Sequence, residues 1–347
     1  MTKNYSLQAL RAIAALLVVF AHSMTQINMA KDIDGQVGYT MRAFESLGGL
    51  GVYVFFIISG YIMSYTTNTK QNGVYVSLVF LKKRFLRVYP VYWICLTMLV
   101  IGWGMGVFLK SHEYSISKII SSYLLIPFVD SESDSINPML SQGWTLMYEV
   151  FFYLTFSLLL LFNLCGFKKI LYLLVVYLLF YLFAHLNIVK FDAFNIFFKR
   201  EAFFLFIVGM ILFEFEKVIK GFMNSQVIYS ALLVLSFIML FSAFIPSLSE
   251  NENIIMFPLA VVVFLLFNTR NVNNTYLNLL GDASYSIYLT HGFIVMLFGN
   301  LIKRFDFSLL TLCSLVFLPF VFSLVLGVYF YRVVELKVIY KSKLIFS

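Results

Sequence analysis

Ten long apolar stretches occupy most of this chain of 347 residues and limit what it can fold into. They lie near 7–29, 47–67, 88–109, 144–165, 169–187, 200–216, 226–246, 253–269, 282–302 and 308–331. An α-helix needs about 17–25 residues to cross the hydrocarbon core of a bilayer, and the sixth and eighth stretches are at or near the short limit. Because lipid offers no hydrogen bonds to peptide groups, such stretches cross as helices. The sequence predicts an all-α integral membrane protein with about ten transmembrane helices.

Composition agrees with this fold class. The chain is 61% hydrophobic and 12% charged, whereas a soluble domain is nearer half apolar and a quarter charged. The net charge of +8 does not by itself indicate nucleic acid, because Lys and Arg in a membrane protein follow the positive-inside rule first. The three cysteines show no CxxC or Cys/His ligand spacing, so we expect neither a disulfide framework nor a metal site. The first apolar stretch lacks a small-residue cleavage site and is interpreted as a retained helix.

The distribution of charge predicts the orientation. If the N-terminus is cytoplasmic and ten spans alternate, the inner segments hold 15 Lys and Arg against 4 Asp and Glu. The outer segments then hold 9 bases against 12 acids. This asymmetry favours both termini in the cytoplasm, with 116–128 as a short interfacial or re-entrant segment that does not cross. We expect a single membrane domain over 1–347 with no appended soluble domain.

The first stretch carries Arg11 and His22, two residues that are costly in lipid. They are eleven residues apart, about 1100° around a helix, so they share one face. Arg11 could be a snorkelling anchor, and His22 could be a hydrogen-bonded packing residue. Their shared face instead favours a polar interior.

The stretch FLKKRFLRVYPVYW (80–93) is predicted to cap the cytoplasmic end of the third span. Ordinary positive-inside anchoring accounts for Lys82 and Lys83. Arg84 and Arg87 are helical neighbours that could bind a phosphate-bearing ligand level with Arg11. Pro90 is expected in the early turns of the helix that follows.

The stretch GWTLMYEVFFYL (143–154) places Glu149 about six residues below the outer surface, at a depth similar to that of His22. An intramembrane carboxylate needs a partner, and Glu149 could hold one imidazole nitrogen of His22 and raise the basicity of the other. The alternative is a buried structural Glu paired with Arg, Tyr or backbone.

Late in the chain, LGDASYSIYLTHGFIV (280–295) places His291 near mid-depth, with Tyr285 and Tyr288 at helical spacing. These residues, with Trp144 of the earlier motif, could line a substrate tunnel. The late segment could equally be a hydrogen-bonded packing seam, and the Gly-rich stretch at 48–61 fits the same kind of close packing.

Together these motifs resemble those of the integral-membrane acyltransferase family 3, a bacterial group that O-acylates cell-surface sugars. The matching pieces are Arg11 and His22 with ten residues between them, FFIISGY, Arg84-Phe-Leu-Arg87 with VYPVYW, GWTLMYE and SYSIYLTH, over about residues 5–335. Thr145 departs from the family pattern, which usually has Ser there, but keeps the hydroxyl.

The resemblance implies transfer across the membrane, from an acyl-CoA donor on the cytoplasmic side to a sugar hydroxyl on the outer side. It implies that Arg11, Arg84 and Arg87 bind the donor and that His22 and Glu149 are the catalytic residues. We therefore expect transfer of an acyl group, most simply acetyl from acetyl-CoA, to a polysaccharide or lipid-linked sugar, in the bacterial cytoplasmic (inner) membrane and without a metal or nucleic acid. The alternative is a polytopic transporter of a glycan precursor or small molecule, because intramembrane Arg, His and Glu also line permeation paths.

Overall fold

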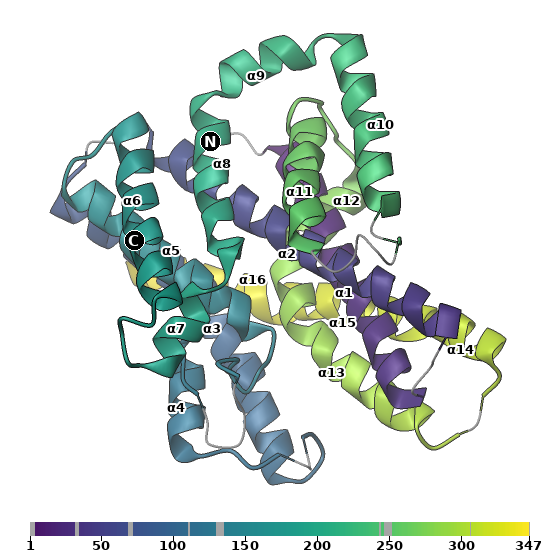
Figure 1. Cartoon of the computed structure of the whole chain (residues 1–347). Coiled ribbons are helices and arrows are strands. Elements are labelled where there is room, and N and C mark those ends of the chain that lie inside the picture. The colour runs from purple at the N-terminus through teal and green to yellow at the C-terminus, as the bar shows by residue number, and fades with distance from the viewer. Residues whose placement is uncertain are drawn as a thin grey trace. The chain divides into compact units, whose positions relative to one another are not determined.

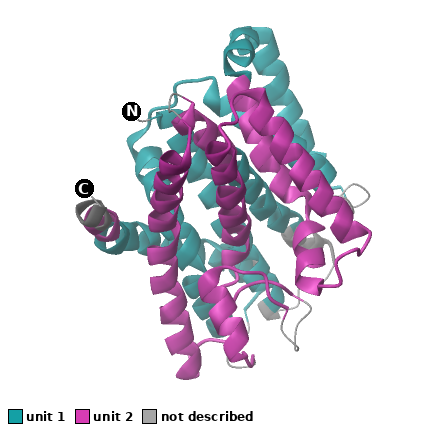
Figure 2. Ribbon diagram, turned by 90° about the vertical axis from the view of Figure 1, so that its left-hand side faces the viewer, with its two compact units in different colours: residues 1–58, 215–335 teal, residues 59–214, 336–347 magenta. Residues whose placement is uncertain are grey.

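The computed structural model describes residues 4–31, 35–68, 72–109, 112–129, 135–242, 244–245, 252–305 and 307–346. All regular secondary structure in this described part is helical, and the chain divides into two compact units (Figures 1 and 2). Unit 1 comprises residues Met1–Ile58 and Phe215–Glu335, and unit 2 comprises Ser59–Glu214 and Leu336–Ser347. The boundary at Ile58 falls within one helix.

Unit 1 contains α1 (Tyr5–Lys31), most of α2 (Gly35–Thr67), α9 (Glu216–Met223), α10 (Gln226–Ser242), α11 (Glu252–Asn268), α12 (Thr275–Asp282), α13 (Ser284–Ile302), α14 (Leu309–Leu315), α15 (Phe317–Phe330) and the π-helical segment η3 (Tyr331–Glu335). Unit 2 contains the end of α2, then α3 (Val74–Gly104), α4 (Ile116–Leu124), α5 (Gly143–Leu161), α6 (Phe167–His185), α7 (Asp192–Phe198), the short 3₁₀ helix η1 (Glu201–Phe203), α8 (Phe204–Glu214) and α16 (Leu336–Phe346).

The all-α integral membrane class is confirmed. Within the described residues, 7 helices are long and apolar enough to cross a membrane, or up to 8 if the bent pair α9–α10 forms one span. The predicted stretches at 200–216, 226–246 and 253–269 do not each form a single helix long enough to count as a membrane span. The first stretch is divided between η1 and the short helix α8. The second stretch contains α10, which is bent by 95° against α9 (Figure 1), and its residues 243 and 246 lie outside the described part. The third stretch forms α11, which has only 17 residues. The count of ten and the cytoplasmic termini stay predictions.

The helix that contains the third predicted span begins earlier than expected. A span from 88 was expected, whereas α3 begins at Val74, after Gly73 with a φ of 137°. Residues 74–81 (VYVSLVFL) are apolar and contain no helix breaker, so nothing ends the helix before the basic residues. Pro90 consequently lies inside α3 and not in its first turns. A proline within a membrane helix is tolerated where neighbouring groups satisfy the carbonyl that it leaves free.

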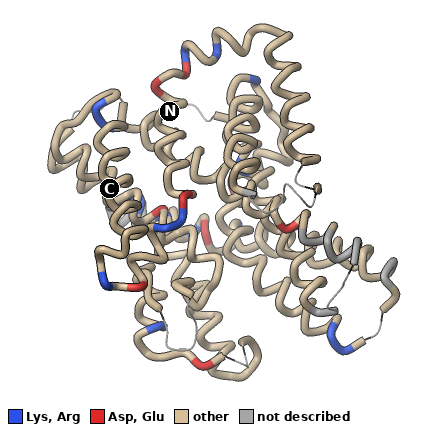
Figure 3. Tube along the Cα trace, viewed as in Figure 1, with Lys and Arg blue, Asp and Glu red and all other residues tan. Residues whose placement is uncertain are grey.

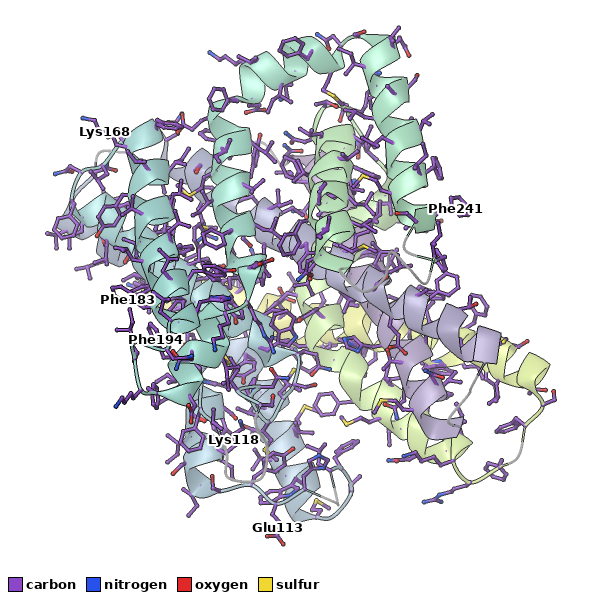
Figure 4. All side chains as sticks on the ribbon, in the orientation of Figure 1. Glu113, Lys118, Lys168, Phe183, Phe194 and Phe241 are labelled. Atoms are coloured by element: carbon purple, nitrogen blue, oxygen red, sulfur yellow. The ribbon has the colours of Figure 1, made fainter. Side chains whose placement is uncertain are left out.

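The short segment at 116–128 does not cross, as predicted. Helix α4 has 9 residues, about 14 Å, and Ser115 caps its N-terminus, where the serine side chain accepts from the backbone N–H of Lys118. It ends at Leu125 in the left-handed conformation with a φ of 55°. Lys118, labelled in Figure 4, is buried and donates to the carbonyl oxygens of Phe128 and Ser135 at 2.8 and 3.2 Å. Those two bonds fix the chain that returns toward α5.

Helix α1 is the centre of unit 1, where it packs against α12, α13, α11 and α15. Small residues let helices approach closely, as predicted for the Gly-rich stretch. A Cβ placed on Gly51 of α2 would lie 2.5 Å from the carbonyl oxygen of Ala14 and 2.9 Å from a methyl group of Val18. Close backbone approach at small residues is a common way to pack membrane helices.

Replacement of Gly51 by alanine is expected to destabilise unit 1 by about 1–3 kcal/mol, because the added methyl group overpacks the α1–α2 contact. Gly49→Ala is the matched control, since its Cβ would meet nothing closer than the Tyr53 ring at 3.8 Å. Thermal unfolding of the detergent-solubilised protein measures both variants. Equal melting temperatures for the two would contradict the close contact.

The outer surfaces of both units suit lipid. Large apolar side chains such as Phe183 on α6 and Phe241 on α10, both labelled in Figure 4, are 38% and 69% exposed. The Lys, Arg, Asp and Glu residues of the described part lie mainly at helix ends and connections (Figure 3). Such exposed apolar area is unusual for a soluble monomer and is expected where a bilayer covers the helices.

Candidate active site

Helix α1 directs Arg11 and His22 toward the same neighbouring helix. The Nη2 atom of Arg11 donates to the Ser284 hydroxyl at 3.0 Å, and the His22 ring lies 5.1 Å, centroid to centroid, from the ring of His291. Ser284 and His291 both belong to α13. The predicted sharing of one face by Arg11 and His22 is therefore confirmed.

The two histidines differ in their surroundings. His22 keeps exposed surface although protein atoms surround it on most sides, so a small molecule that enters this enclosed space can reach its ring. His291 is fully buried, its Nδ1 lies 3.2 Å from the carbonyl oxygen of Ile287, and its Nε2 has no hydrogen-bond partner among the described residues. Sequence reasoning placed both residues in membrane helices but did not bring them together.

The residues proposed for a tunnel divide between the units. Tyr288 is buried and its ring lies 5.9 Å from that of His291, whereas Tyr285 is half-buried. Trp144 belongs to unit 2, where the Arg200 guanidinium lies 4.9 Å from its ring centroid. A tunnel lined by these residues stays a prediction.

A second polar cluster lies near the N-terminus of α13 in unit 1. The Ser286 hydroxyl donates to Glu335 at 2.5 Å, and Glu335 is a buried carboxylate at the end of the π-helical segment η3. Tyr331 of the same segment interacts electrostatically with Asp282, Glu335 and Arg11. The sequence analysis counted Glu335 among the charges outside the spans. Its position directly after the largely apolar run LVLGVYFYRVV was the signal that it could be a buried carboxylate.

In unit 2, Glu149 has hydroxyl partners. It accepts from the Ser59 hydroxyl at 3.3 Å and from the Tyr153 hydroxyl in a short contact. Pairing of Glu149 with a Tyr was the alternative given for this motif, and Tyr153, one helical turn beyond Glu149 on α5, is that Tyr. The i,i+4 spacing was the signal that could have identified it. Ser59, in the stretch FFIISGY, had no such signal.

Arg84 belongs to the same cluster. Its guanidinium lies 5.4 Å from the Phe80 ring centroid and 5.7 Å from that of Tyr153, and it interacts electrostatically with Glu149 and Arg87. Arg84 is half-buried and Arg87 is exposed. The cluster thus joins a carboxylate and a cation through a buried tyrosine.

The predicted difference in depth between the arginine pair and Glu149 is wrong. Helices α3 and α5 run antiparallel, because the Gly73 N–H and the Ser77 hydroxyl donate to the carbonyl oxygens of Leu160 and Ser157, both at 2.9 Å. This register places Glu149 opposite the part of α3 between Arg84 and Arg87. The error follows from the start of α3, which leaves the arginines about 15–20 Å along the helix instead of at its cytoplasmic end.

Two predicted pairings join residues of different units. His22 belongs to unit 1 and Glu149 to unit 2, and Arg11 belongs to unit 1 whereas Arg84 and Arg87 belong to unit 2. Both pairings stay predictions. No group of three or more His, Cys, Asp or Glu residues suited to a metal ion occurs in the described part of the chain.

The sequence model of a family described as "Acyltransferase domain" matches residues 4–332, nearly the whole chain. The chain belongs to this acyltransferase family. The resemblance seen in the motifs is confirmed, and the residues around Arg11 and His22 and around Glu149 and Arg84 lie within the matched acyltransferase domain.

Named relatives of this acyltransferase come from three sources. It is 31% identical over 257 residues to the exopolysaccharide production protein ExoZ of Rhizobium meliloti (strain 1021), covering 72% of this chain and 77% of ExoZ. It is 29% identical over 159 residues to the acyltransferase MdmB of Streptomyces mycarofaciens, covering 44% and 38% of the two chains. An O-acetyl transferase of Shigella phage Sf6 is 30% identical over 162 residues, with 44% and 45% covered. No solved structure matches the chain significantly.

These findings favour acyl transfer over transport for this acyltransferase. Among the described residues, its membrane helices place ionisable side chains around Arg11 and His22 and around Glu149 and Arg84. Each set contains a guanidinium, a type of group that can bind an anion, and an imidazole or a carboxylate, types of group that can exchange a proton. Acyl transfer to a hydroxyl needs both types of group.

Proposed function

We propose that this membrane acyltransferase transfers an acetyl group from acetyl-CoA to a hydroxyl of a surface or exported polysaccharide, in the bacterial inner membrane. The family match over residues 4–332 carries the proposal. The names of ExoZ, an exopolysaccharide production protein, and of the phage O-acetyl transferase support the acetyl group and the glycan acceptor.

In the proposed reaction, His22 is the general base. The acceptor oxygen loses its proton to the imidazole and forms a bond to the thioester carbonyl carbon, the C–S bond breaks, and the departing CoA sulfur takes the proton from the imidazolium. Transient acylation of His22 before transfer to the hydroxyl is the other route to the same products. Glu149 supplies the carboxylate that polarises this imidazole and stabilises its charged form.

The arginines are the proposed donor site, because a guanidinium stays charged and binds phosphate oxygens in a bidentate manner. Arg11 and Arg84 have polar or ionisable neighbours within their own units, namely Ser284 for Arg11 and Tyr153 with Glu149 for Arg84. Arg87 is exposed and offers its guanidinium most directly to a phosphate.

The test of the function uses the native host with the gene deleted or restored. Mass spectrometry of the surface and exported glycans is expected to show O-acetyl groups only when the gene is present. Purified protein in lipid nanodiscs is expected to consume acetyl-CoA, with free CoA released, when glycan from the deletion strain is supplied and no ion gradient exists. Unchanged glycan acylation in the deletion strain would refute the proposal, and glycan movement without CoA release would favour a transporter.

Arg87→Ala is expected to raise the KM for acetyl-CoA about tenfold or more, with a small change in kcat, because a charge-assisted hydrogen bond contributes about 1.5–3 kcal/mol. Lys83→Ala is the matched control, since Lys83 is an exposed cation one helical turn away on α3. Initial rates at varied acetyl-CoA concentration give both parameters. Equal KM changes in the two variants would indicate a general effect of surface charge and would contradict a phosphate contact at Arg87.

A further inference from the structure

We infer that His291 is a positioning residue that accepts a hydrogen bond from His22 and thereby fixes which nitrogen of His22 acts as the base. The inference deepens the proposed function, because it rests on His22 as the group that removes the acceptor proton. It adds a residue within unit 1 that selects the reactive form of that base.

The backbone defines the tautomer of His291. Its Nδ1 lies 3.2 Å from the carbonyl oxygen of Ile287, one helical turn earlier on α13. A carbonyl oxygen can only accept a hydrogen bond, so Nδ1 carries the hydrogen. In a neutral imidazole the other nitrogen then has a bare lone pair. His291 therefore presents Nε2 as a hydrogen-bond acceptor.

That acceptor is buried and lacks a donor in the described part of the chain. The His291 side chain has no exposed surface, and Nε2 is among its buried atoms without a hydrogen-bond partner. Buried polar atoms in native proteins nearly always have a partner, and an exception calls for an explanation. A donor that arrives only in the working enzyme is one such explanation.

The candidate donor is the N–H group of the neighbouring His22 ring. The two ring centroids are 5.1 Å apart and the planes are inclined by 32°. At this separation, nitrogens turned toward each other come within the reach of a direct hydrogen bond or of one bridging water. Tyr288, the other aromatic neighbour, has its ring centroid 5.9 Å away. His22 is also exposed, so it can face His291 on one side and the acceptor on the other.

The pair has a simple chemical consequence. A neutral His22 that donates its single N–H to Nε2 of His291 must present the opposite nitrogen without a hydrogen, ready to accept the proton of the sugar hydroxyl. Once His22 has taken that proton, its N–H bond to His291 becomes charge-assisted and stronger. Glu149 then acts on the charge of the imidazolium and does not select the tautomer.

Two substitutions at residue 291 separate this role from simple packing. The amide of His291→Asn can still donate to the Ile287 carbonyl but has no group at the position of Nε2. The amide oxygen of His291→Gln can accept from His22 at that position but gives up the contact with Ile287. We expect the Asn variant to lose about ten- to hundredfold in kcat, by analogy with the partners that orient metal-ligating histidines, whose loss has an effect of this size. The Gln variant is expected to recover most of that loss.

The assay uses membranes from the native host lacking the chromosomal gene and carrying each variant, with radiolabelled acetyl-CoA as the probe and label in the glycan as the readout. The KM for acetyl-CoA is expected to stay within about twofold, because His291 is not a phosphate ligand. Melting temperatures of the solubilised variants verify that each one is folded.

The possible outcomes separate the two proposals. Wild-type kcat in a folded Asn variant, or equal losses in the Asn and Gln variants, would overturn the role of His291 while leaving His22 as the base. Full activity of His22→Ala would refute the assignment of His22 as the base, and with it the proposed mechanism. Loss in the Asn variant with recovery in the Gln variant supports a hydrogen-bond acceptor at this position.

Discussion

His22→Ala is expected to abolish glycan acylation while the protein still inserts into the membrane. Alanine cannot accept the hydroxyl proton, and removal of a general base typically lowers the rate about 10²–10⁴-fold. The methyl side chain also leaves no nucleophile for an acyl-histidine route. The measurement is acetyl label in the glycan of membranes that contain equal amounts of wild-type and variant protein.

His185→Ala is the control for this prediction. His185 is exposed at the end of α6, and its Nδ1 lies 3.0 Å from the carbonyl oxygen of Tyr181, so its loss is expected to leave acylation unchanged. Full acylation by the His22 variant would refute the assignment of the base. An acetyl group found on the His22 peptide after rapid quenching would favour the two-step route over direct transfer.

Glu149→Gln is expected to lower kcat about 10²-fold or more and to reduce stability as well. The amide keeps the size of the side chain but removes the charge that, in the proposed mechanism, stabilises a protonated His22. It also leaves the half-buried Arg84 without its neighbouring anion. Breaking a buried charge pair by removing one partner costs about 3–5 kcal/mol, and partial exposure of both groups makes the expected loss smaller.

Tyr153→Phe separates the two effects. This variant keeps the carboxylate of Glu149 and removes only the hydroxyl that donates to it, so we expect a modest loss of stability and at most about a tenfold loss of kcat, the scale of one hydrogen bond. Equal kcat losses in the two variants would mean that Glu149 serves only to hold the cluster together. Melting temperatures and initial rates, measured on the same preparations, provide the comparison.

The features predictable from the sequence are those that depend on local pattern. Hydropathy identified the membrane class because lipid exposure leaves a continuous apolar signal. Helical periodicity placed Arg11 and His22 on one face, and both indeed contact α13. The length of the segment at 116–128 correctly excluded a crossing there, because 9 residues of helix are too few.

The errors arose where tertiary context decides. The basic residues of 82–87 were taken as the boundary of a helix, but a helix can continue through charges that other groups or water can solvate, and α3 does so. The predicted difference in membrane depth between Arg84 and Glu149 depended on that boundary and was wrong for the same reason. The approach of His291 to His22 depends on the packing of α1 against α13, which no spacing within either helix records.

The length of α3 has a consequence for the membrane around unit 2. Its 31 residues extend about 46 Å, whereas the hydrocarbon core is about 30 Å thick. Lys82, Lys83 and Arg87 are exposed in the middle of this helix, beside the 19-residue α5. A flat hydrocarbon slab that covered α5 would also cover these ammonium and guanidinium groups. Because such groups are costly in hydrocarbon, water or a bound ligand is expected to reach this part of α3, through a polar path or a locally thinned leaflet.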